Sequence, residues 1–187
     1  MLKTGLLLLF PSLFFIGEFY TLYRVSKNKK YGQIIENIII IVAVTLLLIF
    51  NSRFKFPIHS FIMIIFIYTL LGHTLIGQCM DAYHKNKYFD RFLHGLGAFS
   101  FALFIYSVMQ NIIGPLQSPK GYIPYFIAAA GLSIGTFFEI LEFMIDSISK
   151  KPKYSKHQHG LADTDFDLIG NFIGSVIAGV VSVYIFI

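Results

Sequence analysis

Residues 166–186 read FDLIGNFIGSVIAGVVSVYIF, a run of 21 residues in which Asp167 is the one charged side chain. A helix rises about 1.5 Å per residue, so a bilayer core of about 30 Å needs about 20 helical residues. The length and apolar character of this run therefore predict a helix that crosses a membrane.

Five further apolar runs of similar length precede it, and prolines and glycines fall in the breaks between them. We therefore predict an all-α polytopic transmembrane bundle in which residues 1–187 form a single integral membrane domain. The second helix is the shortest and has the least clearly marked ends. The predicted helices lie near 5–23, 34–50, 58–77, 91–113, 123–148 and 166–186.

The composition supports this fold class and excludes others. Hydrophobic residues make up 56% of the chain and charged residues 13%, against roughly 25% charged residues in soluble domains. The net charge of +5 does not indicate a nucleic-acid partner, because the basic residues lie in short loops, where they contact anionic lipid headgroups. The single cysteine, Cys79, excludes an intrachain disulfide. Glu18 and the lack of an A-x-A-like site predict that the first run is retained rather than cleaved as a signal peptide.

Basic residues in short loops also predict the orientation. Eleven of the fifteen lie in or beside the first, third and fifth loops, including Lys29, Lys85 and Lys150. These loops are therefore expected in the cytoplasm and both termini outside it. The prediction is a multi-pass protein of the inner or plasma membrane whose partners are the bilayer and its anionic headgroups, with the oligomeric state left open.

The acidic residues are few and unevenly distributed. Seven of the ten fall into three short segments at the ends of predicted helices, which an up-and-down bundle brings to one membrane face. By the charge count this face is cytoplasmic. The three segments hold Asp90; Glu139, Glu142 and Asp146; and Asp163, Asp165 and Asp167.

Helical spacing places these acids on shared faces. Asp90 and His94 are four residues apart, and the three acids of the fifth helix follow an i, i+3, i+7 pattern. Asp163, Asp167 and Asn171 form another stripe if the sixth helix starts early enough. Gly170 and Gly174 follow in a small-xxx-small pattern that predicts close helix packing.

Carboxylates at membrane depth require compensation, since a charge at the bilayer centre costs roughly 2.5–3.5 kcal/mol on insertion scales. Two interpretations stay open: a structural salt-bridge network with Arg91 as its cation, or a functional site. In the second, a divalent metal ion such as Mg²⁺ or Mn²⁺, held by Asp90, His94, Glu142 and Asp167, competes with a lipid headgroup. The full candidate set is Asp90, Arg91, His94, Glu139, Glu142, Asp146, Asp163, Asp167 and Asn171.

Three segments carry a resemblance to a known family: DRFLHG at 90–95, FEILEF at 138–143 and DTDFDLIGNFIG at 163–174. Together they resemble the YjdF-like (DUF2238) bacterial inner-membrane proteins and the wider VanZ-like group, over residues 88–175. The resemblance implies a membrane protein, and for the VanZ-like group a link to glycopeptide resistance. VanZ-like members tend to carry Gln where this chain has Glu142, so the site here is more acidic.

Two other intramembrane groups and one loop are weaker candidates. His73 is expected to be a packed, hydrogen-bonded histidine, and Glu18 could reach the acidic cluster. The loop 150–159, with His157 and His159, is expected to be solvated and to contact headgroups.

The sequence does not decide whether the protein is an enzyme. The open functions are a metal- or lipid-binding membrane protein, a metal-dependent hydrolase of a lipid-linked phosphate or ester, and a structural or envelope-stress resistance module.

Overall fold

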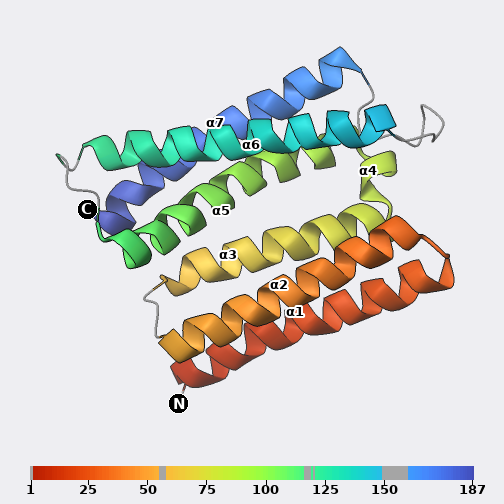
Figure 1. The fold of residues 1–187 in the computed structure, drawn as a ribbon, viewed down its shortest axis with the longest axis horizontal. Coiled ribbons are helices and arrows are strands. Elements are labelled where there is room, and N and C mark those ends of the chain that lie inside the picture. The colour runs from red at the N-terminus through yellow and green to blue at the C-terminus, as the bar shows by residue number, and fades with distance from the viewer. Residues whose placement is uncertain (1, 55–57, 116–118, 120, 149–159) are drawn as a thin grey trace. The chain divides into compact units, whose positions relative to one another are not determined.

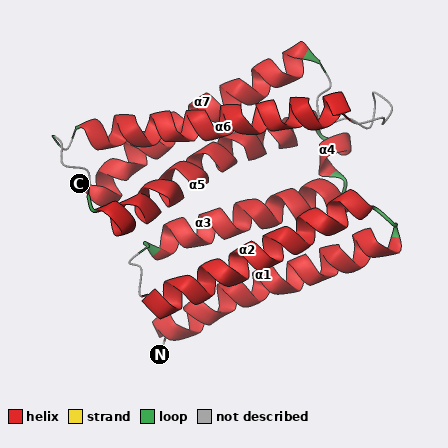
Figure 2. Cartoon of the chain, in the orientation of Figure 1, coloured by secondary structure: helices red, strands yellow, loops and turns green. Residues whose placement is uncertain are grey.

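The computed structural model describes residues 2–54, 58–115, 119, 121–148 and 160–187. These residues are helical, with short connections and no strand among them (Figure 2). In chain order the elements are α1 (Leu2–Lys27), α2 (Tyr31–Phe54), α3 (Ser60–Leu71), the π-helix η1 (Gly72–Cys79), α4 (Ala82–Lys85), α5 (Lys87–Ile113), α6 (Tyr122–Ile148) and α7 (Leu161–Phe186).

Five of the described helical stretches are long and apolar enough to cross a membrane. They are Tyr31–Arg53, Ser60–Cys79, Lys87–Ile113, Tyr122–Ile148 and Leu161–Phe186. The fold is therefore all-α, as expected from the sequence. Helix α1 has 26 residues, which is long enough to be a sixth span, and the count of six stays a prediction.

All but the third of the spanning helices are longer than the apolar runs predicted. Helix α2 has 24 residues and the highest mean hydropathy of the five spans, 2.5, so the expectation that it is the shortest was wrong. Helix α5 begins at Lys87 rather than 91, and α7 begins at Leu161 rather than 166. Acidic residues favour helix N-termini, because they complement the positive end of the helix dipole. Asp90, Asp163 and Asp165 therefore lie inside helices instead of in the breaks.

In this protein, small and polar side chains are buried and large apolar side chains are exposed, which is the reverse of the pattern in a soluble protein. The buried face of α7 carries small and polar residues, namely Asp167, Asn171, Gly174, Ser175, Ala178, Gly179 and Ser182. Its exposed face carries large apolar residues such as Phe172, Ile177 and Val180. Lipid is as apolar as leucine, so helices in a bilayer associate through close packing and polar contacts rather than through hydrophobic burial. This pattern is the one expected of a helix surrounded by lipid.

The chain forms two compact units, Met1–Phe89 and Asp90–Ile187, which we call unit 1 and unit 2 and describe separately. In unit 1, the third span changes from an α-helix to a π-helix at Gly72. The amide of Met80 donates to the carbonyl of Leu75 at 2.9 Å as this segment ends. The α1–α2 turn, η1 and α4 lie at one end of the unit (Figure 1).

In unit 2, glycines bring three helices into backbone contact. A Cβ atom at Gly170 of α7 would lie 2.7 Å from the carbonyl oxygen of Arg91 on α5, and one at Gly174 would collide with Gly95. A Cβ at Gly131 of α6 would lie 2.9 Å from the carbonyl oxygen of Ala98. Real Cβ atoms essentially never approach heavy atoms this closely. The three helices can therefore pack in this way only because these positions carry no side chain.

Candidate functional site

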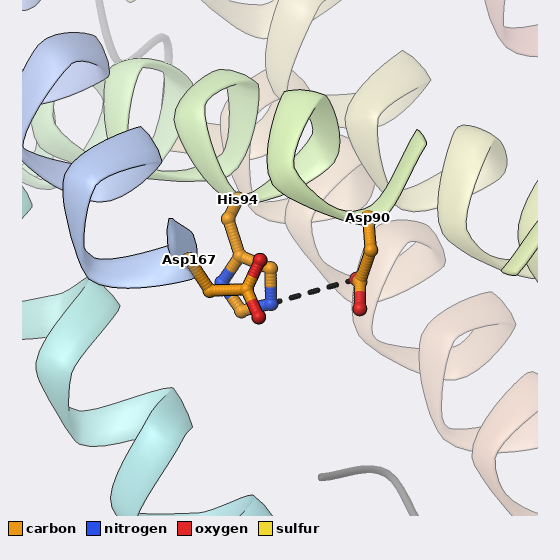
Figure 3. Close-up of side chains that lie close together, drawn as sticks. All are labelled: Asp90, His94 and Asp167. Carbon is orange, nitrogen blue, oxygen red and sulfur yellow. Dashed lines mark ion pairs between the residues drawn. The ribbon is translucent and has the colours of Figure 1, made fainter. Parts of the chain in front are cut away.

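Helix α5 contributes Asp90 and His94, which lie one turn apart on the same face. The Oδ1 atom of Asp90 lies 3.6 Å from Nε2 of His94 (Figure 3). Both side chains are largely withdrawn from the surface, with exposed fractions of 27% for Asp90 and 12% for His94. The pair belongs to the first turns of α5, so it lies near one end of the helix.

Helix α6 brings a second acid to the opposite side of the imidazole. The Oε1 atom of Glu139 lies 3.3 Å from Nδ1 of His94, and Glu139 is 4% exposed. Glu139 belongs to a buried stripe that runs from Ile123 through Gly131 and Gly135 to Asp146. One face of this membrane helix is thus lined by glycines in its middle and by acids toward its C-terminal end.

Helix α7 contributes Asp167 and Asn171, which are four residues apart. Asp167 is 3% exposed and Asn171 1%. The side-chain nitrogen of Asn171 lies 3.5 Å from Nδ1 of His94. The Oδ1 atom of Asp167 is buried and has no hydrogen-bond partner among the described residues. A buried acceptor left in this way costs about 1–3 kcal/mol, and more if it is charged.

The glycine contacts explain how these side chains meet. A Cβ at Gly135 of α6 would collide with the side chain of Asn171 on α7. The amide of Asn171 therefore occupies the space that the missing side chain leaves, where it faces His94. Gly170 and Gly174 lie in the contact with α5, on either side of Asn171 in the chain. The ends of α5, α6 and α7 that carry the acids lie together at one end of unit 2 (Figure 1).

His94 lies at the centre of two groups that have the ligand types of a metal site. In one, ligand atoms of Asp90, His94 and Asp167 all lie within 4.8 Å of one another (Figure 3). In the other, those of His94, Glu139 and Glu142 do so. The four residues proposed as metal ligands from the sequence, Asp90, His94, Glu142 and Asp167, are therefore divided between two groups that share the imidazole. Glu139 takes part as well, on the same side as Glu142.

The charge in this region is strongly negative. Glu142 lies within electrostatic range of Glu139, Asp90, Asp167 and Asp146. The candidate cation, Arg91, has its guanidinium carbon 4.0 Å from the centre of the Phe166 ring, a distance typical of a cation–π contact, and it also acts on Asp167.

The other predicted site residues lie further along the same helices. Asp146 is 6% exposed and Asp163 is half-buried. Their neighbour Asp165, which was not in the candidate set, is exposed. The loop from Lys150 to His159, with its two histidines, lies outside the described residues.

A second polar group lies in unit 1. The sequence predicted its member His73 to be a hydrogen-bonded histidine, as the structure confirms, but did not identify the partners. His73 contacts Glu36 through Nε2 at 2.7 Å and the Tyr83 hydroxyl through Nδ1 at 2.5 Å. Gln78 donates to Glu36 at 2.7 Å and lies 2.9 Å from His73. The five-residue spacing of His73 and Gln78 does not indicate a shared face on an α-helix, but both lie on the π-helix η1, whose hydrogen bonds join residues five apart. Glu18, which was considered for the acidic cluster, accepts a hydrogen bond from Thr74 of unit 1 at 2.7 Å.

Comparison with known proteins gives the family. No solved structure matches the chain. A protein of Thermotoga maritima described as uncharacterized is 31% identical over 102 residues, which cover 54% of this chain and 51% of that protein. The match thus spans about half the length of this curated relative. The model of a family of predicted membrane proteins, DUF2238, matches residues 5–186. This match covers nearly the whole chain, so the protein belongs to the DUF2238 family of predicted membrane proteins.

Proposed function

We propose that unit 2 binds a divalent metal ion between α5 and α7, with Asp90, His94 and Asp167 as its protein ligands. The main support for the proposal is the environment of the Oδ1 atom of Asp167. This atom is buried without a hydrogen-bond partner among the described residues, and its carboxylate belongs to a group of three potential metal ligands within 4.8 Å of one another. A cation there would satisfy the oxygen and offset the charge of the neighbouring acids.

The donor set restricts the kind of ion. Two carboxylates and one imidazole provide mainly hard oxygen ligands, which suit Mn²⁺ and Mg²⁺. The second carboxylate pair, Glu139 and Glu142, adds negative charge nearby and raises the local attraction for any divalent cation. The side-chain nitrogen of Asn171 lies 3.5 Å from Nδ1 of the imidazole, and Asn171 adds no charge to the site.

The two sides of His94 suggest different roles for its two nitrogens. Nε2 faces Asp90 and is the nitrogen that would bind the metal. Nδ1 faces Glu139 and would donate its hydrogen to that carboxylate. Metal-binding histidines almost always make such a second hydrogen bond, because it fixes the tautomer and the orientation of the ring. Glu139 is therefore proposed as the residue that positions His94.

The proposed location is the cytoplasmic face of the inner or plasma membrane. The proposal is supported by the basic loops, which predict that the acid-bearing ends of α5, α6 and α7 lie on that side. A metal at this depth is close to the phosphates of lipid headgroups, which bind divalent cations. A lipid headgroup is therefore the ligand class proposed for any open coordination position.

A second candidate function is hydrolysis of a lipid-linked phosphate or ester. It is favoured by Glu142, a half-buried carboxylate beside the proposed metal ligands, which has the chemistry of a general base. A bound divalent ion polarises a phosphate and lowers the pKa of bound water. The link to glycopeptide resistance in the VanZ-like group belongs with this candidate, since it also concerns the cell envelope.

Metal content and Mn²⁺ affinity test the proposal. The full chain, purified in lipid nanodiscs and loaded with Mn²⁺, is compared with two variants that remove the same charge from α7. Asp167→Asn is expected to lose metal, whereas Asp165→Asn, at an exposed position two residues away, is expected to keep it. Loss of one carboxylate ligand is expected to weaken binding by about 100-fold, at least as much as loss of a group that is hydrogen-bonded to a ligand.

Thermal unfolding of the same samples distinguishes binding from a structural network. If the proposal holds, Mn²⁺ stabilises the wild type and Asp165→Asn but not Asp167→Asn, because a ligand that binds the folded state adds to its stability. Wild-type protein that binds no Mn²⁺ or Mg²⁺, and that unfolds at the same temperature with and without them, would mean that the acids only join the helices. Lipid phosphate release by the wild type, absent in Glu142→Gln, would support the hydrolase.

A further inference from the structure

Unit 1 contains polar groups that the proposed metal site does not use, and Glu18 lies at their centre. Glu18 and Asn37 are both 0% exposed, on the adjacent helices α1 and α2. The Oε1 atom of Glu18 accepts a hydrogen bond from Thr74 at 2.7 Å. Its Oε2 atom, and both polar side-chain atoms of Asn37, have no hydrogen-bond partner among the described residues. Burial of polar side-chain atoms costs free energy unless they form hydrogen bonds.

A proton on the Glu18 carboxyl group would allow these buried polar atoms to form hydrogen bonds. A protonated carboxyl group is a hydrogen-bond donor as well as an acceptor. Asn37 lies within hydrogen-bonding reach of the Glu18 carboxyl. The hydroxyl of a protonated Glu18 can donate to the side-chain oxygen of Asn37, so that one proton satisfies a buried atom on each helix. It would also remove the charge from a carboxyl group that has no contact with solvent.

The titratable groups around Glu18 come from several elements. Glu36 of α2 and His73 of η1 both lie close enough to act on its carboxyl electrostatically. Tyr83 of α4 is bonded to His73. Helix α3 also packs against α1, and its Tyr68 bonds to the carbonyl of Phe10 at 3.3 Å, two turns of α1 away from Glu18.

A chain of hydrogen bonds extends from this region toward the surface. The His73 ring lies between the carboxylate of Glu36 and the hydroxyl of Tyr83, so each ring nitrogen has a partner that can exchange a proton with it. The side chains of His73 and Glu36 are 33% and 41% exposed, in contrast to the complete burial of Glu18. Exposure therefore rises from Glu18 to Glu36 within a few side chains.

The local backbone conformation positions His73. His73, Thr74 and Gln78 all lie on η1, and π-helical turns are frequent at functional sites. A Cβ at Gly77 would collide with the ring of Tyr83, so the phenol reaches His73 through the space that this glycine leaves. The described residues of unit 1 provide no group of three metal-ligand types comparable to those around His94, which favours a proton over a metal ion as the occupant.

We propose that Glu18 is a proton-binding site and that His73, with Glu36 and Tyr83, exchanges its proton with the membrane surface. Chains of acidic residues and histidines serve as proton relays in membrane proteins. The inference concerns unit 1 and does not depend on the metal site of unit 2.

The exchange proceeds by simple proton transfer. The O–H bond of Glu18 breaks and an N–H bond forms at His73, with a water molecule bridging the two groups. The proton on the other ring nitrogen passes to the Glu36 carboxylate, or to the Tyr83 oxygen as that hydroxyl releases its own proton, and from there to bulk water. No electron is transferred, and the carboxylate of Glu18 is restored to the acid by the reverse sequence.

Infrared spectroscopy of the full chain in lipid nanodiscs tests both parts of the proposal. The carbonyl band of a protonated carboxylic acid is recorded for the wild type and for Glu18→Gln, and their difference isolates the band of Glu18. If Glu18→Gln fails to fold, Glu18→Asp serves instead, because it shifts the band rather than removing it. A spectrum without any such difference would overturn the proposal.

Transfer from H₂O to D₂O then measures how fast the proton of Glu18 exchanges. His73→Gln is expected to slow the deuterium shift of this band by about 100-fold, a contribution typical of a positioned proton-transfer group. The matched control is His84→Gln, since His84 is another histidine of unit 1 and is paired with Asp81 at 2.8 Å. Equal exchange rates in His73→Gln and His84→Gln would show that the proton reaches Glu18 by another route.

Discussion

Replacing Gly174 by alanine tests whether the close backbone contact between α5 and α7 contributes to the stability of unit 2. The new Cβ would meet the carbonyl group of Gly95, whose carbon lies 2.7 Å away and whose oxygen is closer still. Ordinary van der Waals contacts start at 3.4 Å, so the carbon alone requires the helices to separate by about 0.7 Å. The obstacle is backbone, which no side-chain rotation can move aside.

The expected loss of stability follows from two opposing effects. Overpacking of a tight contact costs about 1–3 kcal/mol, and a clash with backbone belongs at the upper end. Alanine is favoured over glycine in a helix by about 1 kcal/mol. The net destabilisation is therefore about 2 kcal/mol, which corresponds to a Tm about 4–8 °C lower for a chain of this size.

The same displacement would disrupt the proposed metal site. His94 is the neighbour of Gly95 on α5, and Asp167 lies two turns before Gly174 on α7. A movement of about 0.7 Å exceeds the tolerance of about 0.2 Å for metal–ligand distances. Gly174→Ala is therefore expected to weaken Mn²⁺ binding as well as to lower the Tm.

Thermal unfolding in detergent and Mn²⁺ titration are the assays, and Gly97→Ala is the matched control. A Cβ at Gly97, also on α5, meets nothing within 4 Å. That variant is expected to be as stable as the wild type or slightly more stable, with unchanged Mn²⁺ affinity. A Gly174→Ala protein that is as stable as Gly97→Ala would refute the close approach of the two helices.

Two further predictions concern other parts of the chain. Gly77→Ala is expected to displace the ring of Tyr83 from His73, because the new Cβ would lie 2.7 Å from the Cζ atom of that ring. A change in the imidazole ¹⁵N signals of His73 would report the displacement. Unchanged signals would argue against the contact between Gly77 and Tyr83. A reporter enzyme fused to the C-terminus is expected to be active only when the enzyme is one that works outside the cytoplasm, since the basic loops predict that both termini lie there. Activity of a reporter that works only in the cytoplasm would reverse the orientation and place the metal site on the other face.

Much of the fold follows from hydropathy alone. The runs that predicted helices near 91–113 and 123–148 correspond to α5 and α6, whose C-terminal ends agree with the expected ones. The start of α7 differs by five residues, because Asp163 and Asp165 are polar yet helical. An apolar run marks the part of a helix inside the hydrocarbon, whereas the backbone stays helical beyond it wherever its hydrogen bonds are satisfied.

The spacing of the acids also had predictive value within each helix, but not between helices. Asp90 and His94 share a face because they are four apart, and the same holds for Asp167 and Asn171. Nothing in that spacing indicates that Glu139 rather than Glu142 faces Nδ1 of His94, or that the acids divide into two groups around one imidazole. The rotation of α6 about its axis decides this, and the contacts of Gly131 and Gly135 fix that rotation.

The amino-acid sequence is sufficient to predict a helical membrane protein with acids gathered at helix ends, because the length and hydropathy of a span are set by the thickness of the bilayer. Which side chains meet is visible only in the folded arrangement of the helices. That arrangement joined His73 to Glu36, 37 residues away in the chain, through a π-helix that no α-helical periodicity predicts. It also placed Asp167 beside His94 through glycine contacts between α5 and α7. Both outcomes depend on close packing between helices. Packing is determined by how the surfaces of two helices fit together, which the sequence of one segment does not specify.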